Sequence, residues 1–225
     1  MCMRKLGLFI GRFQIFHNAH KQTIERMLKE CDEVLILIGS ANSSSNLTNP
    51  FTYEDRKEMI ELAFGDLDNS LGIKRLNFAP LNDFRYVNSD WIQQVHEVVN
   101  TFKGINGVSY AETKLYGYKK DFTSEYLDWF PGFTRVETNN SADQRDASKI
   151  RDSIFREGFV DVLNQKHLPK TTVDFLSNWI AYSLGFERLK AWFSYEDKYK
   201  QDTRFIGVPY DPIFVTVDPV VICMN

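Results

Sequence analysis

The sequence has few cysteines and no pairing pattern among them. Cys2, Cys31 and Cys223 are far apart, and these three cysteines form no C-x-x-C pair. An odd, scattered set of this kind fits neither a disulfide framework nor a zinc site. We therefore expect the protein to work in a reducing compartment, the cytoplasm.

The sequence also lacks a long hydrophobic run and an excess of positive charge. Its N-terminal apolar stretch, residues 6–10, is interrupted by Gly11 and Arg12, and no run approaches the ~20 apolar residues that cross a bilayer. The formal net charge is -3, so the chain has no overall positive field for a nucleic-acid backbone. We expect neither a membrane nor a nucleic-acid partner, and an anionic ligand must be bound by local groups.

What is present is the composition of an ordinary globular protein, with 225 residues of which 43% are hydrophobic and 25% charged. Apolar runs at residues 5–10 and 33–38 each end at a glycine and predict buried strands. Residues 21–29 between them have helical spacing, with Ile24 and Met27 on one face. A strand, a helix and a strand within about 30 residues form a βαβ unit, which is nearly always right-handed and gives parallel strands.

The same alternation continues along the chain. It predicts a doubly wound (Rossmann-like) parallel α/β sheet with a C-terminal helical cap that begins near residue 146. In such a sheet, ligands bind at the carboxyl ends of the strands. The predicted helices are 53–64, 90–102, 150–156 and 172–184, and the predicted strands are 73–78, 108–110, 114–116 and 134–136.

The segment 11–20, Gly-Arg-Phe-Gln-Ile-Phe-His-Asn-Ala-His, lies where the first strand ends and the first helix begins. Gly11 permits close approach of a phosphate, Arg12 offers a planar fork of donors, and a helix N-terminus favours negative charge. His17 and His20 are three residues apart and can point to the same place. No nucleophile or third metal ligand is spaced to act with them, so the segment predicts a polyphosphate site. The alternative for the two histidines is a helix cap and a packed core or surface histidine.

Segment 11–20 resembles the G-R-F-Q-P-F-H-x-G-H signature of the archaeal-type nicotinamide-mononucleotide (NMN) adenylyltransferases in the nucleotidyltransferase superfamily. Ile15 and Ala19 stand where the family usually has proline and glycine. Residues 39–60 resemble the second conserved block of that family, and residues 146–151 resemble its S-x-T-x-x-R motif, with Asp146 in place of serine or asparagine. Asp146 is also a good helix N-cap. The resemblance covers residues 4–185.

This resemblance implies an enzyme that transfers AMP from ATP to NMN, forming NAD and pyrophosphate in NAD biosynthesis. ATP and NMN are then the small-molecule partners, Mg2+ travels with ATP and needs no protein cage, and family members commonly form homo-oligomers. The residues and the resemblance together assign catalysis to Arg12, His17, His20 and Arg151, ATP binding to Gly11, Phe13, Gln14, Gly117 and Ser148, and NMN binding to Ser40, Arg56, Asp83 and Trp91.

Each of the outlying residues also has a simpler interpretation. Trp91 is expected to stack on the cationic pyridinium, but it is also a plausible core residue, as Asp83 is a plausible turn residue. Arg56 follows Thr52, a candidate N-cap, and on its own would be a solvated helix charge. Gly117, at a strand end, is small enough to admit an adenine or ribose.

The C-terminal part changes in composition. Residues 187–204 are rich in charge and aromatics, and residues 210–218, Tyr-Asp-Pro-Ile-Phe-Val-Thr-Val-Asp, resemble the opening strand of the Nudix hydrolase domain in bifunctional family members. We therefore divide the chain into an adenylyltransferase domain at 1–185, a linker at 186–205 and the first strand of an incomplete Nudix domain at 206–225. The Nudix box itself is absent from the sequence, which excludes an active Nudix hydrolase within it.

Two alternatives stay open at this point. One is the same transfer to another phosphate acceptor, such as a flavin or pantetheine phosphate, which only the Trp91 region disfavours. The other is a non-catalytic nucleotide-binding sensor, consistent with the departures at Ile15, Ala19 and Asp146. The sequence does not separate NMN from its deamidated analogue, nicotinate mononucleotide.

Overall fold

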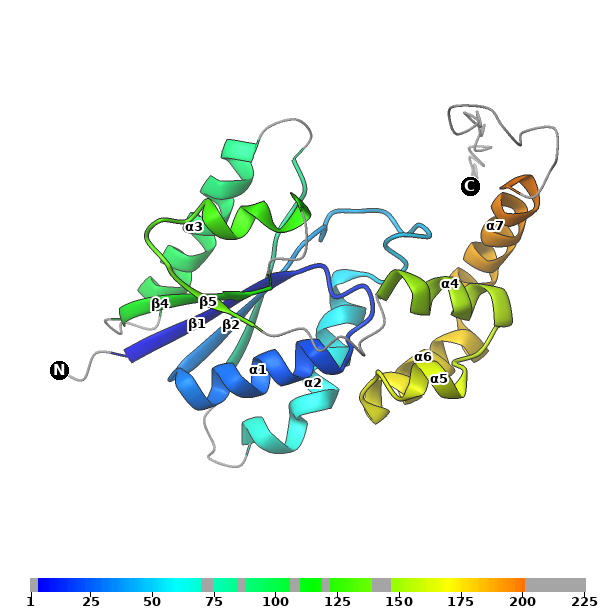
Figure 1. Ribbon diagram of the computed structural model, residues 1–225, viewed down its shortest axis with the longest axis horizontal. Helices are drawn as coiled ribbons and strands as arrows, with labels where there is room; N and C mark the ends of the chain where they lie inside the picture. Colours follow the sequence, from blue (N-terminus) through cyan, green and yellow to red (C-terminus); the bar gives the residue numbers. More distant parts are fainter. Residues whose placement is uncertain are drawn as a thin grey trace, which may run out of the picture.

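Five parallel strands form a single sheet in the order β3-β2-β1-β4-β5 (Figure 1). The computed structural model describes residues 4–69, 75–84, 88–105, 110–118, 122–138 and 147–200. The strands are β1 (Arg4–Gly11), β2 (Glu33–Ile38), β3 (Leu76–Pro80), β4 (Tyr110–Gly117) and β5 (Thr134–Glu137). This sheet confirms the predicted doubly wound parallel architecture.

Helices cover both faces of the sheet (Figure 1). Alternate residues of β1 point to opposite faces, so Leu6 and Leu8 lie in one buried cluster and Phe9 lies in the other. The first cluster includes Val95 of α3, and the second includes Ile24 of α1. The helices against the sheet are α1 (Asn18–Glu30), α2 (Tyr53–Asn69) and α3 (Asn88–Ile105). A short 3-10 helix, η1 (Phe122–Asp128), lies between β4 and β5 in the chain.

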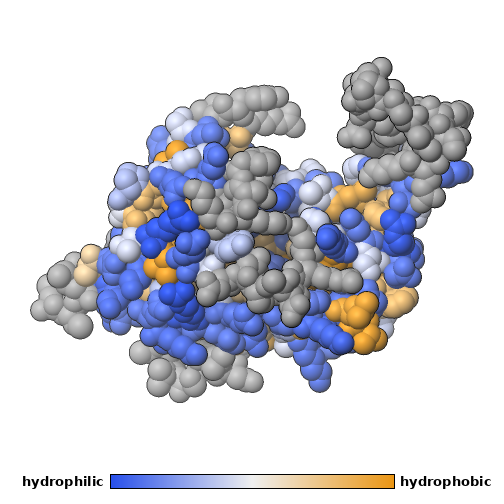
Figure 2. All heavy atoms as spheres, in the orientation of Figure 1, coloured by the Kyte–Doolittle hydropathy of each residue, from blue (hydrophilic) through white to orange (hydrophobic). Residues whose placement is uncertain are grey.

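Four further helices follow the sheet and lie beside it (Figure 1): α4 (Ala147–Glu157), α5 (Val162–Gln165), α6 (Lys170–Tyr182) and α7 (Leu184–Lys200). They confirm the predicted helical cap. On the face shown in Figure 2, hydrophilic residues predominate, and apolar ones show both on the side of α3 and over these C-terminal helices. Val162 and Leu163 of α5 are exposed.

Helix α7 occupies much of the segment for which composition predicts a linker. Phe186, Leu189 and Phe193 have helical spacing, and the first two are buried while Phe193 packs on the same cluster. The Phe186 ring centroid lies 5.1 Å from that of Trp179 in α6. A high density of charged residues therefore does not exclude a packed helix, because one apolar stripe is enough to dock it against the core. The strand predicted near the C-terminus lies outside the described residues, and the domain division stays a prediction.

One smaller difference concerns the strands. The strand predicted at 114–116 and the last residue of the strand predicted at 108–110 belong to one strand, β4. Over the residues described, no helix is both long enough and apolar enough to cross a membrane.

The strand order places a switch point between β1 and β4. From β1 the chain winds outward through β2 to β3, and then returns to the other side of β1 to form β4 and β5. The connections after β1 and β4 therefore diverge at the carboxyl edge, which is where ligands bind in open α/β sheets.

Candidate active site

The loop after β1 is fixed by apolar side chains. Phe13, Ile15 and Phe16 are all buried, whereas Arg12 is exposed. Phe13 adopts a left-handed backbone with φ 50°, and a Cβ on Gly11 would lie 2.9 Å from the Phe13 ring. Gly11 is therefore required by the packing of Phe13. The Phe13 side chain, only 2% exposed, faces the core, so an ATP contact from this residue is left to its backbone.

The structure brings His17 and His20 together at the start of α1. Their rings are stacked, with centroids 3.6 Å apart and an interplanar angle of 21°. The backbone N–H of His17 donates to Nδ1 of His20 at 3.4 Å, so the neutral His20 ring carries its proton on Nε2. Burial, and then the charge of His17, hold the pKa of His20 well below its usual value. His20 is thus a neutral hydrogen-bond donor through Nε2.

The helix N-terminus is less open to an anion than the sequence predicts. The backbone N–H of Asn18, the first of α1, donates to the carbonyl of His167 at 2.9 Å. The Asn18 side chain also donates, at 3.1 Å, to the carbonyl of Lys166. These two bonds tie the start of α1 to the segment between α5 and α6, so this first amide serves tertiary structure.

Helix α4 reaches the same loop from far along the chain. The guanidinium of Arg151 donates to the backbone carbonyl of Gln14 at 2.7 Å and to Oγ of Ser148 at 3.1 Å. Arg151 is only 7% exposed. Two predicted phosphate ligands, Arg151 and Ser148, are thereby placed beside the loop that carries Arg12 and the histidines. Asp146, which precedes this helix, lies outside the described residues.

The side chain of Gln14, predicted to bind ATP, is used inside the protein. Its Nε2 donates to the Phe51 carbonyl at 3.0 Å, and its Oε1 accepts from the Phe51 N–H at 3.1 Å. Gln14 is 4% exposed. This reciprocal pair joins the loop after β1 to the segment before α2, which favours a structural role for the side chain.

Arg56 and Ser40 are also buried, although both are predicted to bind NMN. Arg56 is 1% exposed and its guanidinium faces backbone carbonyls, while Ser40 is 4% exposed and left-handed, with φ 52°. Burial lowers the pKa of Arg56 to about 10, which leaves the group charged near neutral pH. Thr52 caps the helix as predicted, since the N–H of Asp55 donates to Thr52 Oγ1 at 3.2 Å.

Asp83 lies at the same edge of the sheet, after β3. The Asp83 side chain is exposed. Its backbone is held by Asn42, a residue that the motifs did not identify. The Asp83 N–H donates to Oδ1 of Asn42 at 3.0 Å, and Nδ2 of Asn42 donates to the Asp83 carbonyl at 3.4 Å. Asn42 follows Ser40 in a polar loop, and that proximity is the only sequence signal for it.

Trp91 belongs to an aromatic cluster formed by α3, η1 and the turn after η1. Its ring centroid lies 5.7 Å from that of Tyr126 and 6.1 Å from that of Trp129, both edge to face. The Tyr126 hydroxyl donates to the carbonyl of Ile10 at 3.0 Å, which ties the cluster to the end of β1. Trp91 is partly exposed, so packing and ligand contact are compatible.

The space next to Gly117 is filled by protein. A Cβ at this position would lie 2.5 Å from Cδ2 of Leu127. Leu127 is 3% exposed and belongs to the buried cluster under α3. A packing requirement therefore explains why a glycine stands at position 117, and the contact with adenine or ribose stays a prediction.

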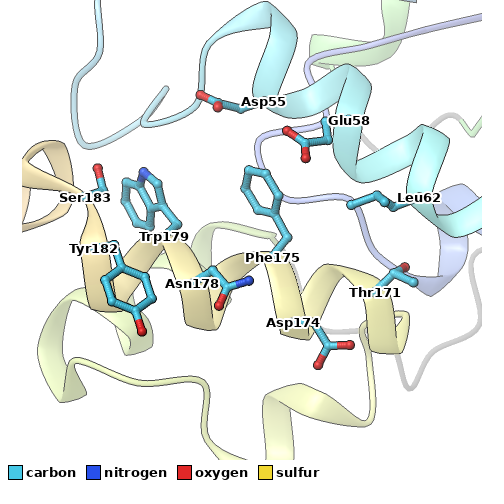
Figure 3. Close-up of a pocket in the computed structure, with 10 residues that line it drawn as sticks. All are labelled: Asp55, Glu58, Leu62, Thr171, Asp174, Phe175, Asn178, Trp179, Tyr182 and Ser183. Atoms are coloured by element: carbon cyan, nitrogen blue, oxygen red, sulfur yellow. The ribbon is translucent and has the colours of Figure 1, made fainter.

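A separate cavity of about 540 Å³ lies between α2 and α6 (Figure 3). None of the predicted site residues lines it. Carboxylates of α2 and aromatic rings of α6 face one another across it. Its walls are formed by Asp55, Glu58, Leu62, Thr171, Asp174, Phe175, Asn178, Trp179, Tyr182 and Ser183.

Comparison with known proteins identifies relatives of the chain. Residues 8–154 match the family described as cytidylyltransferase-like. The nicotinamide/nicotinic acid mononucleotide adenylyltransferase of Acinetobacter baylyi is 34% identical over 76% of this chain and 85% of its own length. The nicotinamide-nucleotide adenylyltransferase of Archaeoglobus fulgidus is 38% identical over 53% of this chain and 71% of its own length.

A solved structure is similar over nearly the whole chain. It is the bifunctional NMN adenylyltransferase/ADP ribose pyrophosphatase of Francisella tularensis, with a TM-score of 0.75 and 27% identity over 94% of this chain. The chain spans 59% of the length of that protein. The same protein has also been solved in complex with AMP and a manganese ion, and it aligns with a TM-score of 0.74, 26% identity and coverage of 94% of this chain and 58% of that one.

Proposed function

The chain belongs to the cytidylyltransferase-like family, and from that membership we propose how its carboxyl edge acts as a nicotinamide-nucleotide adenylyltransferase. Such an enzyme transfers AMP from ATP to the phosphate of a nicotinamide mononucleotide, in NAD biosynthesis. The observation that carries the assignment of the site is the convergence of His17, His20 and Arg151 on the loop after β1.

In the reaction, a phosphate oxygen of NMN attacks the α-phosphorus of ATP in line and expels pyrophosphate. No protein nucleophile is needed, so the enzyme contributes alignment and charge stabilisation. Arg12 and Arg151 bind the polyphosphate, with Ser148 beside Arg151. His17 and His20 donate hydrogen bonds to the transferred and leaving phosphates, where negative charge develops.

A divalent metal fits this site as part of the substrate. Among the residues that the structure describes, no group of three or more His, Cys, Asp or Glu side chains is arranged to hold a metal ion. We propose Mg2+ bound by the triphosphate, with most of its waters retained, where it neutralises phosphate charge.

The acceptor is recognised by residues that follow β3 in the chain. We propose that Asp83 and the partly exposed Trp91 contact the nicotinamide mononucleotide, with the indole and the cationic pyridinium attracted by stacking and cation–π interaction. Arg56 and Ser40 are buried, so they support the loops after β1 and β2 from inside the protein. We propose NMN as the preferred acceptor, with nicotinate mononucleotide as the close competitor.

The sequence resemblance also supports proposals that extend beyond the site. We propose a cytoplasmic homo-oligomer, and a domain division in which residues 206–225 begin a Nudix-like domain. Light scattering of the purified chain tests the oligomer.

Pyrophosphate release tests the function. The protein is incubated with ATP, Mg2+ and NMN, and in parallel with nicotinate mononucleotide, flavin mononucleotide or pantetheine phosphate as acceptor. Release with NMN, with the lowest KM for that acceptor, is the expected result. Release only with a flavin or pantetheine phosphate overturns the substrate assignment. No release of pyrophosphate with any acceptor favours a nucleotide-binding module.

A further inference from the structure

The guanidinium of Arg56 bonds two loops at once. One terminal nitrogen donates both to the carbonyl of Arg12, at 2.7 Å, and to the carbonyl of Gly39, at 2.6 Å. The other terminal nitrogen donates to the Ser40 carbonyl at 3.3 Å, and Nε donates to the Thr52 carbonyl of its own helix at 2.9 Å. One side chain on α2 therefore joins the loop after β1 to the loop after β2.

The two loops that Arg56 joins both contain a left-handed residue other than glycine. Phe13, which directly follows Arg12, has φ 50°, and Ser40, which directly follows Gly39, has φ 52°. No other non-glycine residue in the described ranges has a positive φ. Such conformations are unfavourable for residues with a Cβ and persist where the surroundings over-determine them. The bonds from Arg56 to the adjoining carbonyls contribute to that constraint, together with the burial of the Phe13 side chain.

We propose that Arg56 is a positioning residue that sets the distance between the ATP-binding loop and the NMN-binding loop, and so the alignment of the two substrates. This inference rests on the proposed function, because it is that function which places ATP at Arg12 and the mononucleotide beyond Ser40. Arg56 acts through the backbone, so its removal shifts both loops and misaligns the attacking phosphate.

A lysine cannot replace this arrangement. The guanidinium is a planar fork of five donors, and here four hydrogen bonds leave it in different directions. An ammonium group keeps the positive charge but donates from a single point on a flexible stem. Arg56→Lys therefore preserves charge while it removes the simultaneous bonds to both loops.

The chain supplies a matched control at the opposite end of the sheet. Arg75, just before β3, donates to the carbonyls of Leu28, at 2.7 Å, and Asp32, at 2.9 Å, and also to that of Cys31. These carbonyls belong to the end of α1 and the turn before β2, away from the carboxyl edge. Arg75→Lys removes the same kind of bond without touching a substrate loop.

The first experiment compares Arg56→Lys and Arg75→Lys for thermal stability, kcat, and KM for ATP and NMN. Both variants are expected to lower Tm. Only Arg56→Lys is expected to lower kcat, by about tenfold or more, because a small misplacement of reacting groups is costly to the rate. Retention of kcat within about twofold in Arg56→Lys, or an equal loss in Arg75→Lys at the same fall in Tm, overturns the proposal.

The second experiment needs no activity. In amide hydrogen exchange, Arg56→Lys is expected to exchange faster in residues 11–16 and 39–43, with the strands unchanged, whereas Arg75→Lys affects residues 28–33. If the wild-type protein releases no pyrophosphate, the proposed function fails while this measurement still tests the linkage of the loops. Unchanged exchange in both loops of Arg56→Lys overturns the linkage itself.

Discussion

The carboxyl and amino ends of the central sheet are each anchored by an arginine that donates to several backbone carbonyls. At the carboxyl end, Arg56 bonds the carbonyls of Arg12 and Gly39, in two loops with left-handed residues. At the amino end, Arg75 bonds carbonyls at the end of α1 and the turn that follows it. The same interaction therefore stabilises a regular connection at one end and a constrained pair of loops at the other.

The two ends also differ in what their other polar side chains do. At the amino end, Arg4 and Tyr110 both bond the carboxylate of Glu33, at 2.7 and 2.8 Å, so these groups satisfy one another. At the carboxyl end, the side chain of Arg12 is exposed and makes no hydrogen bond or ion pair with any residue in the described ranges, while its backbone carbonyl accepts from Arg56. We therefore expect phosphate binding at the edge where a cationic side chain stays exposed, and the predictions that follow test this contrast.

The largest effect is expected for His17→Ala. Loss of one donor at a developing phosphate charge lowers kcat by roughly 10²–10³-fold. Pyrophosphate release measures this, with ATP binding followed in parallel. His167→Ala is the matched control, because the hydrogen bonds of His167 with Asn18 and Asn164 are both made by its backbone. Normal turnover in His17→Ala contradicts the site.

Arg12→Ala compares the two ends directly. Because the Arg12 side chain has no described partner, its removal leaves Tm nearly unchanged, but loss of a charge-assisted bond of about 1.5–3 kcal/mol raises KM for ATP by about tenfold or more. The control is Arg4→Ala at the amino end, which breaks the pair with Glu33 and leaves both KM values unchanged. Equal kinetics in the two variants remove the distinction between the ends.

Trp91→Leu tests recognition of the acceptor. A loss of roughly 0.5–2 kcal/mol of cation–π attraction raises KM for NMN by about two- to thirtyfold and leaves KM for ATP unchanged. Trp192→Leu, in the 42% exposed position on α7, serves as the control. A parallel rise in both KM values assigns Trp91 to packing alone.

Gly117→Ala tests whether a glycine at the carboxyl edge serves the ligand or the fold. The new methyl group meets Leu127, so we expect a loss of roughly 1–3 kcal/mol in the free energy of unfolding, with KM for ATP unchanged. Leu127→Ala in the same chain is expected to relieve the clash. Gly104→Ala in α3, where a Cβ meets nothing within 4 Å, is the neutral control. A raised KM with unchanged stability restores the ATP contact.

The smallest effect concerns the pH dependence of stability. The pKa of His20 is lowered in the folded state from its ordinary value of 6.5, so below that pH the unfolded chain binds a proton that the folded chain resists. Stability therefore falls as pH drops below 6.5. In thermal unfolding between about pH 7 and 5, His20→Gln should show a shallower fall than the wild type. Parallel curves contradict the assignment to His20.

Much of the fold is determined by local pattern. The apolar runs that end at Gly11 and Gly39, and the helical spacing between them, predict the βαβ unit because periodicity of 2 or 3.6 residues decides which face is buried. The motif at residues 11–20 predicts both the place of the site and the pairing of its histidines, because these residues are neighbours in sequence. Helix α7 was not predicted, because its apolar stripe lies within a segment rich in charged residues.

Only the tertiary structure decided what Gln14, Arg56 and Gly117 do. Their partners are Phe51, the carbonyls of Arg12 and Gly39, and Leu127, and most of these lie far from them in the chain. Two of the three act on backbone groups, which every residue possesses and which therefore leave no trace in a pattern of side chains. The sequence by itself thus determined the βαβ unit and where along the chain the candidate site lies, because both depend on residues that are neighbours in sequence. The packing of distant segments determined which side chains hold that candidate site in place.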